Sequence, residues 1–180
     1  TDQFIQLVYI PTETAILSLA FSPDGEKLAG GSDDGVTIWE IESYKQITQI
    51  QTQDIDELAF SPDNQYLISA SKESNGKISV WRTEDWSIEK TVNIGEVSDI
   101  EFTQKGDTLL VATGQRLLTI NVNGWALANV VFNGLVPFNG KNYLMRITDF
   151  DLAPNGELIA IGFDRYSLFG VLEYPSGKIR

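Results

Sequence analysis

Cysteine and histidine are both missing from this 180-residue chain. Without cysteine it has no disulfide framework, thiolate nucleophile or sulfur-ligated zinc. Without histidine it lacks the usual general base and the commonest metal ligand. Together the two absences exclude Ser-His-Asp, Cys-His and His-zinc chemistry within this sequence. We therefore expect a non-enzyme with no catalytic residue, no metal site and no cofactor.

Basic residues are scarce as well, since 13 Lys and Arg face 25 Asp and Glu and give a net charge of -12. Such a surface repels phosphate backbones and anionic lipid, so we expect neither nucleic-acid nor membrane binding. No apolar run reaches the roughly 18 residues that a membrane-spanning helix needs. The chain starts at Thr1 without a basic and apolar leader, and we interpret it as an excised or processed piece of a cytoplasmic protein.

What the chain has is a repeat, in which an apolar strand runs four times into a similar turn. The four occurrences begin at Phe21, Phe60, Phe102 and Leu152, with start-to-start spacings of 39, 42 and 50 residues. In the first of them Ser-Pro-Asp-Gly follows Phe21, and Pro, Asp and Gly suit a tight reversal. Self-similarity at this period predicts an array of one supersecondary unit.

Each unit carries signals for four short strands. In the first unit the predicted strands hold Ile16, Leu19 and Phe21, then Leu28 to Ser32, then Val36 to Ile41, then Ile47 and Ile50. Four antiparallel strands in about 40 residues are typical of one propeller blade. The third and fourth units have drifted, and by alignment Asn121 and Gly170 stand where the first two units carry Trp39 and Trp81.

The third strands of the first two units end in Val-Thr-Ile-Trp-Glu at Trp39 and Ile-Ser-Val-Trp-Arg at Trp81. With the Ser-Pro-Asp-Gly turns, these endings resemble the WD40-repeat family over nearly the whole chain. The resemblance implies an all-β fold, a β-propeller of four-stranded antiparallel blades, with about four blades present. It also implies a non-catalytic scaffold for protein-protein interaction. We expect structural roles for Trp39, Trp81, Phe21, Phe60 and Phe102.

In this reading the whole chain, 1–180, is one propeller segment. Its parts are an outer strand at 1–10, blade one at 14–51, blade two at 54–94, blade three at 96–133, a loop insertion at 134–145 and an incomplete blade four at 146–180. Two arrangements fit. The segment from Gln3 to Ile10 pairs with Ser167 to Leu172 and closes a four-bladed ring, or the chain is an arc of a seven- or eight-bladed ring. We favour the arc, which leaves apolar blade faces for further blades of the same chain or for a second copy.

The candidate binding element is the insertion, because 27 residues separate Trp125 from Leu152 where 16 separate Trp86 from Phe102. Loops on a rigid scaffold commonly carry function, and the insertion offers two aromatic anchors. The candidate partner-binding residues are Phe138, Lys141, Tyr143, Arg146, Arg116 and Arg165. The partner is then a protein or peptide, and the cations suit an acidic one. The alternative is that Glu73, Asp149 and Asp164 neutralise the cations locally.

Other readings stay open or are set aside. Aromatic residues recur at the third-to-fourth strand turn, namely Tyr44, Trp86, Trp125 and Tyr174; they form a contact ladder or, as we prefer, cover their own blade ends. Gly134 to Lys141 has the wrong spacing for a phosphate loop, and the Asp pairs lack the remainder of a calcium loop. Two alternative functions are a propeller hydrolase (a lactonase or glycoside hydrolase) using channel carboxylates, and blades that complete a ring with another segment or chain.

Overall fold

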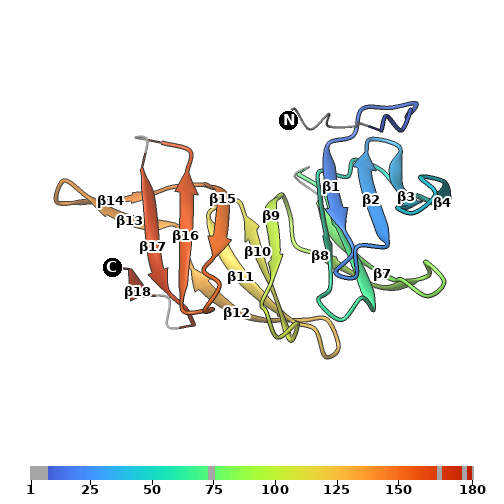
Figure 1. Ribbon diagram of the computed structural model, residues 1–180. Helices are drawn as coiled ribbons and strands as arrows, with labels where there is room; N and C mark the ends of the chain where they lie inside the picture. Colours follow the sequence, from blue (N-terminus) through green and yellow to red (C-terminus); the bar gives the residue numbers. More distant parts are fainter. Residues whose placement is uncertain (1–7, 73–75, 166–167, 176–177, 180) are drawn as a thin grey trace, which may run out of the picture.

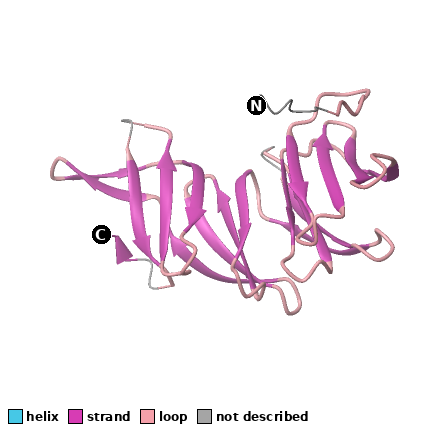
Figure 2. Cartoon of the chain, in the orientation of Figure 1, coloured by secondary structure: helices cyan, strands magenta, loops and turns pink. Residues whose placement is uncertain are grey.

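The regular structure of the described part of the chain is all β-strand. A computed structural model describes residues 8–72, 76–165, 168–175 and 178–179 (Figures 1 and 2). Within these residues there are four four-stranded antiparallel sheets and one two-stranded sheet. The described residues contain no helix long and apolar enough to cross a membrane.

Each four-stranded sheet is one blade, with its strands paired in chain order. Blade one consists of β1 (Ser18–Phe21), β2 (Lys27–Ser32), β3 (Gly35–Glu40) and β4 (Gln46–Gln51). Blade two consists of β5 (Glu57–Phe60), β6 (Tyr66–Ala70), β7 (Lys77–Arg82) and β8 (Ile88–Asn93). Blade three consists of β9 (Val97–Phe102), β10 (Thr108–Thr113), β11 (Arg116–Asn121) and β12 (Ala126–Phe132). Blade four consists of β15 (Ile147–Leu152), β16 (Leu158–Phe163), β17 (Phe169–Glu173) and β18 (Lys178–Ile179).

The predicted Ser-Pro-Asp-Gly turn closes with its own side chains. Ser22 Oγ accepts from the Lys27 backbone N–H at 2.9 Å, and Asp24 Oδ1 accepts from the Glu26 N–H at 3.0 Å. Hydrogen bonds from Ser22 and from the Glu26 backbone lower the pKa of Asp24. Gly25 has a φ of 74°, which glycine adopts without steric cost. The turn residues therefore fix where the second strand begins.

Neighbouring blades share their apolar faces, and the cores lie between sheets. One cluster joins blades one and two through residues such as Ile38 and Phe60; a second joins blades two and three through Val80 and Phe102; a third joins blades three and four. The first strands of successive blades are in contact, β1 with β5, β5 with β9 and β9 with β15. The sheets follow one another along the chain, with blades one and four at opposite ends (Figure 1).

Trp39 and Trp81 are buried, as expected, at 5% and 8% exposure. The predicted equivalents in the other blades, however, were wrong by register. Across the blade-one sheet, Phe21 pairs with Leu28 and Leu28 pairs with Trp39. The equivalent row across blade three is Phe102, Leu109 and Ile120. In blade four that row ends at Leu172, paired with Ile159. Buried aliphatic residues therefore take the tryptophan positions, and Asn121 and Gly170 do not.

The turn aromatics pack at blade junctions. The Trp125 ring of blade three meets Tyr66 of blade two edge-on, with ring centroids 5.1 Å apart. Trp86 packs against the cluster of blades one and two, and Tyr174 against that of blades three and four. Tyr44 of blade one is 46% exposed. Trp86, Trp125 and Tyr174 thus each cover the junction with the preceding blade, and not only the end of their own blade.

Phe21 does not occupy the core position that we expected. Its counterparts Phe60 and Phe102 are buried, but Phe21 is 64% exposed, and Leu19, two residues earlier, is 62% exposed. The physical reason is position. In blades two to four this face lies against the preceding blade, whereas blade one comes first in the described series.

Two predicted boundaries also need comment. The expected outer strand at 1–10 falls mostly on residues outside the described ones, and 8–10 carry no strand. The expected loop insertion at 134–145 is in fact a β-hairpin, formed by β13 (Leu135–Phe138) and β14 (Lys141–Leu144). A pair of positive-φ residues at its tip, Asn139 and Gly140, produces the tight reversal.

Candidate functional site

The candidate site is the end of the propeller at which each blade's fourth strand passes to the next blade's first strand. We call this end the loop face. It also holds the turns between second and third strands, because backbone hydrogen bonds join the two kinds of loop. These bonds run from Ile55 N to Ser32 O (3.1 Å), from Val97 N to Ser71 O (3.1 Å) and from Ile147 N to Gly114 O (2.8 Å). Each blade entry is therefore fastened to the loop of the blade before it.

The hairpin β13–β14 follows blade three and precedes blade four in the sequence, and it extends outward past β17 of blade four (Figure 1). Its base is fixed. Met145 is fully buried and donates its N–H to Gly134 O at 2.9 Å. Gly134 has a φ of 78°, and a Cβ built on it would lie 2.5 Å from Gln115 O. Only glycine fits this close approach, so the hairpin leaves the scaffold at a defined angle.

The hairpin presents the two aromatic residues that the sequence singled out. The Phe138 and Tyr143 rings contact each other with centroids 6.4 Å apart and planes at 62°. Leu135 and Leu144 pair at the base of the hairpin and are 44% and 52% exposed. Leu135 and Leu144 lie on the face of the hairpin opposite to Phe138 and Tyr143, which are only partly exposed. The hairpin therefore carries apolar side chains on both of its faces.

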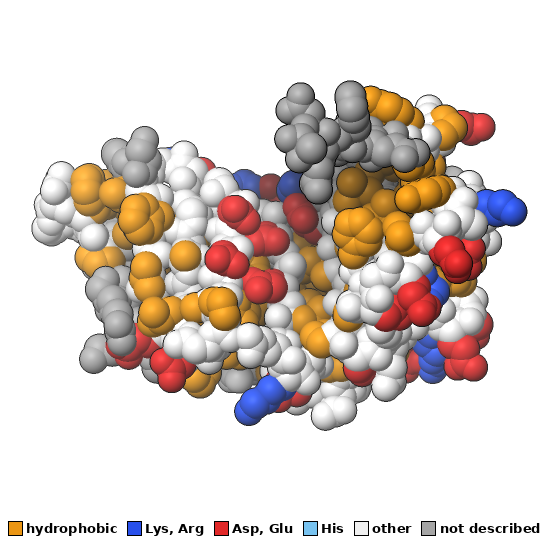
Figure 3. Space-filling model, in the orientation of Figure 1, with side chains coloured by type: hydrophobic (Ala, Val, Ile, Leu, Met, Phe, Trp, Pro, Cys, Tyr) orange, Lys and Arg blue, Asp and Glu red, His pale blue; other side chains and the backbone are white. Residues whose placement is uncertain are grey.

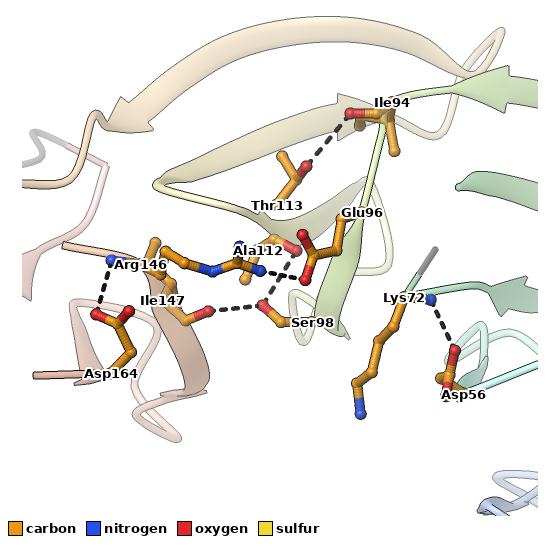
Figure 4. Close-up of polar contacts among 10 residues, drawn as sticks. All are labelled: Asp56, Lys72, Ile94, Glu96, Ser98, Ala112, Thr113, Arg146, Ile147 and Asp164. Atoms are coloured by element: carbon orange, nitrogen blue, oxygen red, sulfur yellow. Dashed lines mark hydrogen bonds and ion pairs between the residues drawn. The ribbon is translucent and has the colours of Figure 1, made fainter. Parts of the chain in front are cut away.

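The predicted cations divide into two groups. Arg146 forms an ion pair with Glu96, and its backbone N–H donates to Asp164 Oδ1 at 3.1 Å (Figure 4). The Arg165 Nε lies 3.9 Å from Oδ2 of the adjacent Asp164. Within the described residues no ion pair involves Arg116 or Lys141. Arg116 follows Gln115 at the hairpin base and Lys141 lies at its tip, so these two cations flank the hairpin.

Lys72, on the loop face of blade two, shows the same local neutralisation. Its Nζ lies 3.1 Å from Glu57 Oε1, and its backbone N–H donates to Asp56 Oδ2 at 2.7 Å (Figure 4). Ser98 nearby bridges two blades by donating to Ile147 O at 3.0 Å. Lys72, Arg146 and Arg165 of the loop face are thus each paired with a carboxylate.

Carboxylates from three blades gather along the first strands, a feature that sequence reasoning missed. They are Glu57 of β5, Asp99 and Glu101 of β9, and Asp149 and Asp151 of β15. Figure 3 shows acidic side chains clustered over the region of β9 and β15. The available signal was the alternation Asp-x-Glu and Asp-x-Asp just before the turns. It becomes informative only once the repeats are aligned on their turns.

Two of these carboxylates tie blade three to blade four. Asp99 Oδ2 accepts the Phe150 N–H at 3.0 Å, and Glu101 Oε2 accepts the Leu152 N–H at 2.9 Å. Burial raises the pKa of Asp99 to about 7, with the Phe150 N–H opposing and the Asp149 side chain adding to the rise. Burial also raises the pKa of Glu101 and that of Glu57, against the opposing effect of Lys72.

The same contacts bear on chemistry. An acid with a pKa near 7 has the property required of a general acid or base, but both Asp99 oxygens accept backbone N–H groups, the second from its own neighbour Ile100 at 2.8 Å. Among the described residues no group of three or more acidic side chains could hold a metal ion. The hydrogen bonds account for Asp99 and Glu101 as links between blades three and four.

Blades of four antiparallel strands, shared apolar faces and a common loop face define a WD40-type β-propeller. The family model described as "Eukaryotic translation initiation factor eIF2A" matches residues 1–128, and the chain belongs to that family.

Curated relatives are WD repeat proteins. The chain is 26% identical over 170 residues to "Periodic tryptophan protein 2 homolog" of Dictyostelium discoideum, covering 84% of this chain and 18% of that protein. It is 33% identical over 73 residues to "WD repeat-containing protein 26 homolog" of Drosophila melanogaster, covering 36% of this chain and 12% of that protein. The chain therefore spans less than a fifth of the length of these two relatives.

Solved propellers share the fold. The WD40 repeats of RRP9 match with a TM-score of 0.77 at 16% identity, covering 95% of this chain and 52% of that one. The hydrazine synthase of Kuenenia stuttgartiensis matches with a TM-score of 0.77 at 19% identity, covering 98% and 51%. U3-55K matches with a TM-score of 0.76. The WD40 prediction is confirmed, and the chain corresponds to about half of each of the first two solved chains.

Proposed function

We propose that this chain is part of a non-catalytic scaffold of a cytoplasmic protein that binds a protein or peptide through the loop face. The observation that carries the proposal is the β13–β14 hairpin, which is fixed at Gly134 and presents Phe138 and Tyr143. A preorganised aromatic surface loses little conformational entropy on binding, so modest contacts suffice for affinity. WD repeat relatives and WD40 neighbours support a scaffold role.

The partner's chemistry follows from the hairpin's flanks. Arg116 and Lys141 have no ion pair within the described residues, so an acidic segment laid across Phe138 and Tyr143 meets positive charge at both ends of the hairpin. The net charge of -12 argues against a phosphate backbone as the ligand. The family's description as a translation initiation factor makes proteins of initiation complexes the first place to seek this partner.

Affinity capture from cytosol with the intact protein, followed by binding measurements on purified candidates, tests the proposal. We expect the double variant Phe138→Ala/Tyr143→Ala to lose the partner that the wild type retains. The matched control is Tyr44→Ala, which removes an exposed aromatic residue from the third-to-fourth strand turn of blade one. Retention of every partner by the double variant would refute binding through the hairpin.

A second role, completing a ring with further blades, is favoured by the exposed face of blade one. Leu19 and Phe21 occupy the row that is buried in every other blade, and the solved propellers are about twice as long as this chain. In the intact protein we expect Phe21→Lys to lower the melting temperature, because another blade covers this face. An unchanged melting temperature would show that the face is open to solvent.

A further inference from the structure

Strand β12 is the outer edge of blade three, and its composition differs from that of the other outer strands. It lies at the end of the sheet order, beside β11 only. Of its seven residues, Ala126–Phe132, Asn129 alone is polar and none is charged. By contrast β4 carries Gln at three of six positions, and β8 carries Glu89 and Lys90.

An edge strand has backbone N–H and C=O groups that point away from its sheet at every second residue. Natural proteins usually protect such edges with charged side chains, proline or very short strands. β12 has no charge and no proline and is seven residues long; its protection is limited to two bulges against β11, at Val131 and at Ala128. Leu127 and Val130 are nevertheless 56% and 52% exposed. The segment is uncharged over seven residues and ends in Val130, Val131 and Phe132, which favour strands. Such an edge can accept another strand.

A groove of about 430 Å³ lies over the face of the blade-three sheet that meets blade four, and it extends from β10 and β11 to β12. Val130 and Thr119 line one side, and Tyr174 and Pro175 of blade four line the other. Inside the sheet, the Asn129 N–H donates to Thr119 Oγ1 at 3.1 Å, where the register of β12 shifts. An extended segment on the outer edge of β12 can therefore pair its backbone with the strand and place side chains in the groove.

We propose that the β12 edge binds an extended segment of a partner protein by strand addition. The surface is separate from the loop face and extends the scaffold role to a second site. The occupant is basic, because the molecule carries a net charge of -12 and Asp107 acts electrostatically on Tyr174, which lines the groove. A second copy is disfavoured by the same net charge, since two such chains repel each other.

The probe is a synthetic peptide, Lys-Thr-Val-Thr-Val-Thr-Val-Lys, offered to the intact protein. The control peptide has the same side chains but carries N-methyl groups on its backbone amides. The methyl groups remove the N–H donors and so block strand pairing. Fluorescence anisotropy measures the affinity, and hydrogen exchange locates the protected amides. We expect the unmethylated peptide to protect residues 126–132, and the methylated peptide to bind at least about tenfold more weakly.

Leu127→Lys tests the surface, and Ile88→Lys is the matched control. Ile88 pairs with Trp81 in blade two as Leu127 pairs with Ile120 in blade three, and both side chains are about half exposed. We expect Leu127→Lys to lose peptide binding and Ile88→Lys to retain it, with melting temperatures unchanged.

Equal binding of the two peptides would overturn the proposal, and so would equal loss in the two lysine variants or protection confined to another strand. Light scattering is the remaining measurement. If the wild type is a dimer and Leu127→Lys is a monomer, the proposal is overturned in favour of a second copy at this edge.

Discussion

Replacing Asp99 by Asn tests the carboxylates between blades three and four. Asn can still accept the Phe150 N–H, which lies 3.0 Å from Asp99 Oδ2 in the wild type, but it carries no charge. The charges facing Asp99 are Asp149 of β15 and Glu57 of β5. Neutralising Asp99 therefore removes like-charge repulsion and desolvation and keeps the Phe150 hydrogen bond. The amide nitrogen cannot accept the Ile100 N–H, but that loss is the same at every pH and leaves the pH dependence to the charge.

The pKa of Asp99 is raised in the fold, so the folded state holds this proton more tightly than the unfolded chain does. The stability that this proton contributes is complete below the ordinary pKa of 3.8 and is lost as pH rises through about 7. A rise of this size corresponds to about 4 kcal/mol, and solvent screening at this half-buried position lowers it to on the order of 2 kcal/mol. Relative to wild type, Asp99→Asn should therefore gain about 2 kcal/mol between pH 4 and pH 8.

The assay is urea unfolding of both proteins at pH 4, 6 and 8, with the difference in unfolding free energy taken at each pH. Asp34→Asn, which removes the same charge from the exposed turn after β2, controls for net charge. A constant difference between Asp99→Asn and wild type across this range would refute the reasoning. A pH-dependent gain of the same size in Asp34→Asn would assign the effect to net charge alone.

Three further predictions concern packing. Trp39→Ala should cost about 3 to 5 kcal/mol in chemical unfolding, because it truncates a buried ring; a loss below about 1 kcal/mol would contradict the burial. Trp81→Phe should cost about 1 kcal/mol in the same assay, since the indole Nε1 donates to Ser69 Oγ at 2.9 Å; equal stability would mean that this bond contributes nothing net. Gly134→Ala should cost at least about 1 to 2 kcal/mol and speed amide exchange at the base of the hairpin, because the new Cβ meets Gln115 O at a positive φ; unchanged exchange would show that the hairpin is held elsewhere.

The repeated turns and the two tryptophans were sufficient to predict the blades. Ser22, Asp24 and Gly25 act within a few residues of one another, so their effect can be read locally. The register beyond the turns was harder to predict. The dipeptide Thr-Ile precedes both Trp39 and Asn121, which suggested that Asn121 occupies the position of Trp39. A slip of one residue moves a side chain to the other face of a sheet, and so Ile120 was overlooked.

Features that depend on contacts between blades could not be predicted in this way. The exposure of Phe21 depends on which sheet lies beside blade one, and the same Phe-Ser-Pro sequence is buried at Phe60. The acidic cluster required β5, β9 and β15 to be placed side by side. The hairpin could be located by its length, but its rigid base required Gly134 and Gln115 to be seen in contact.

The hydrogen bonds from Ile55, Val97 and Ile147 to the preceding loops have a mechanical consequence. The loop backbone that would contact a ligand is also hydrogen-bonded to the start of the following blade. A displacement of one loop is therefore transmitted to the neighbouring blade. A partner bound to these loops would stabilise the junctions between blades.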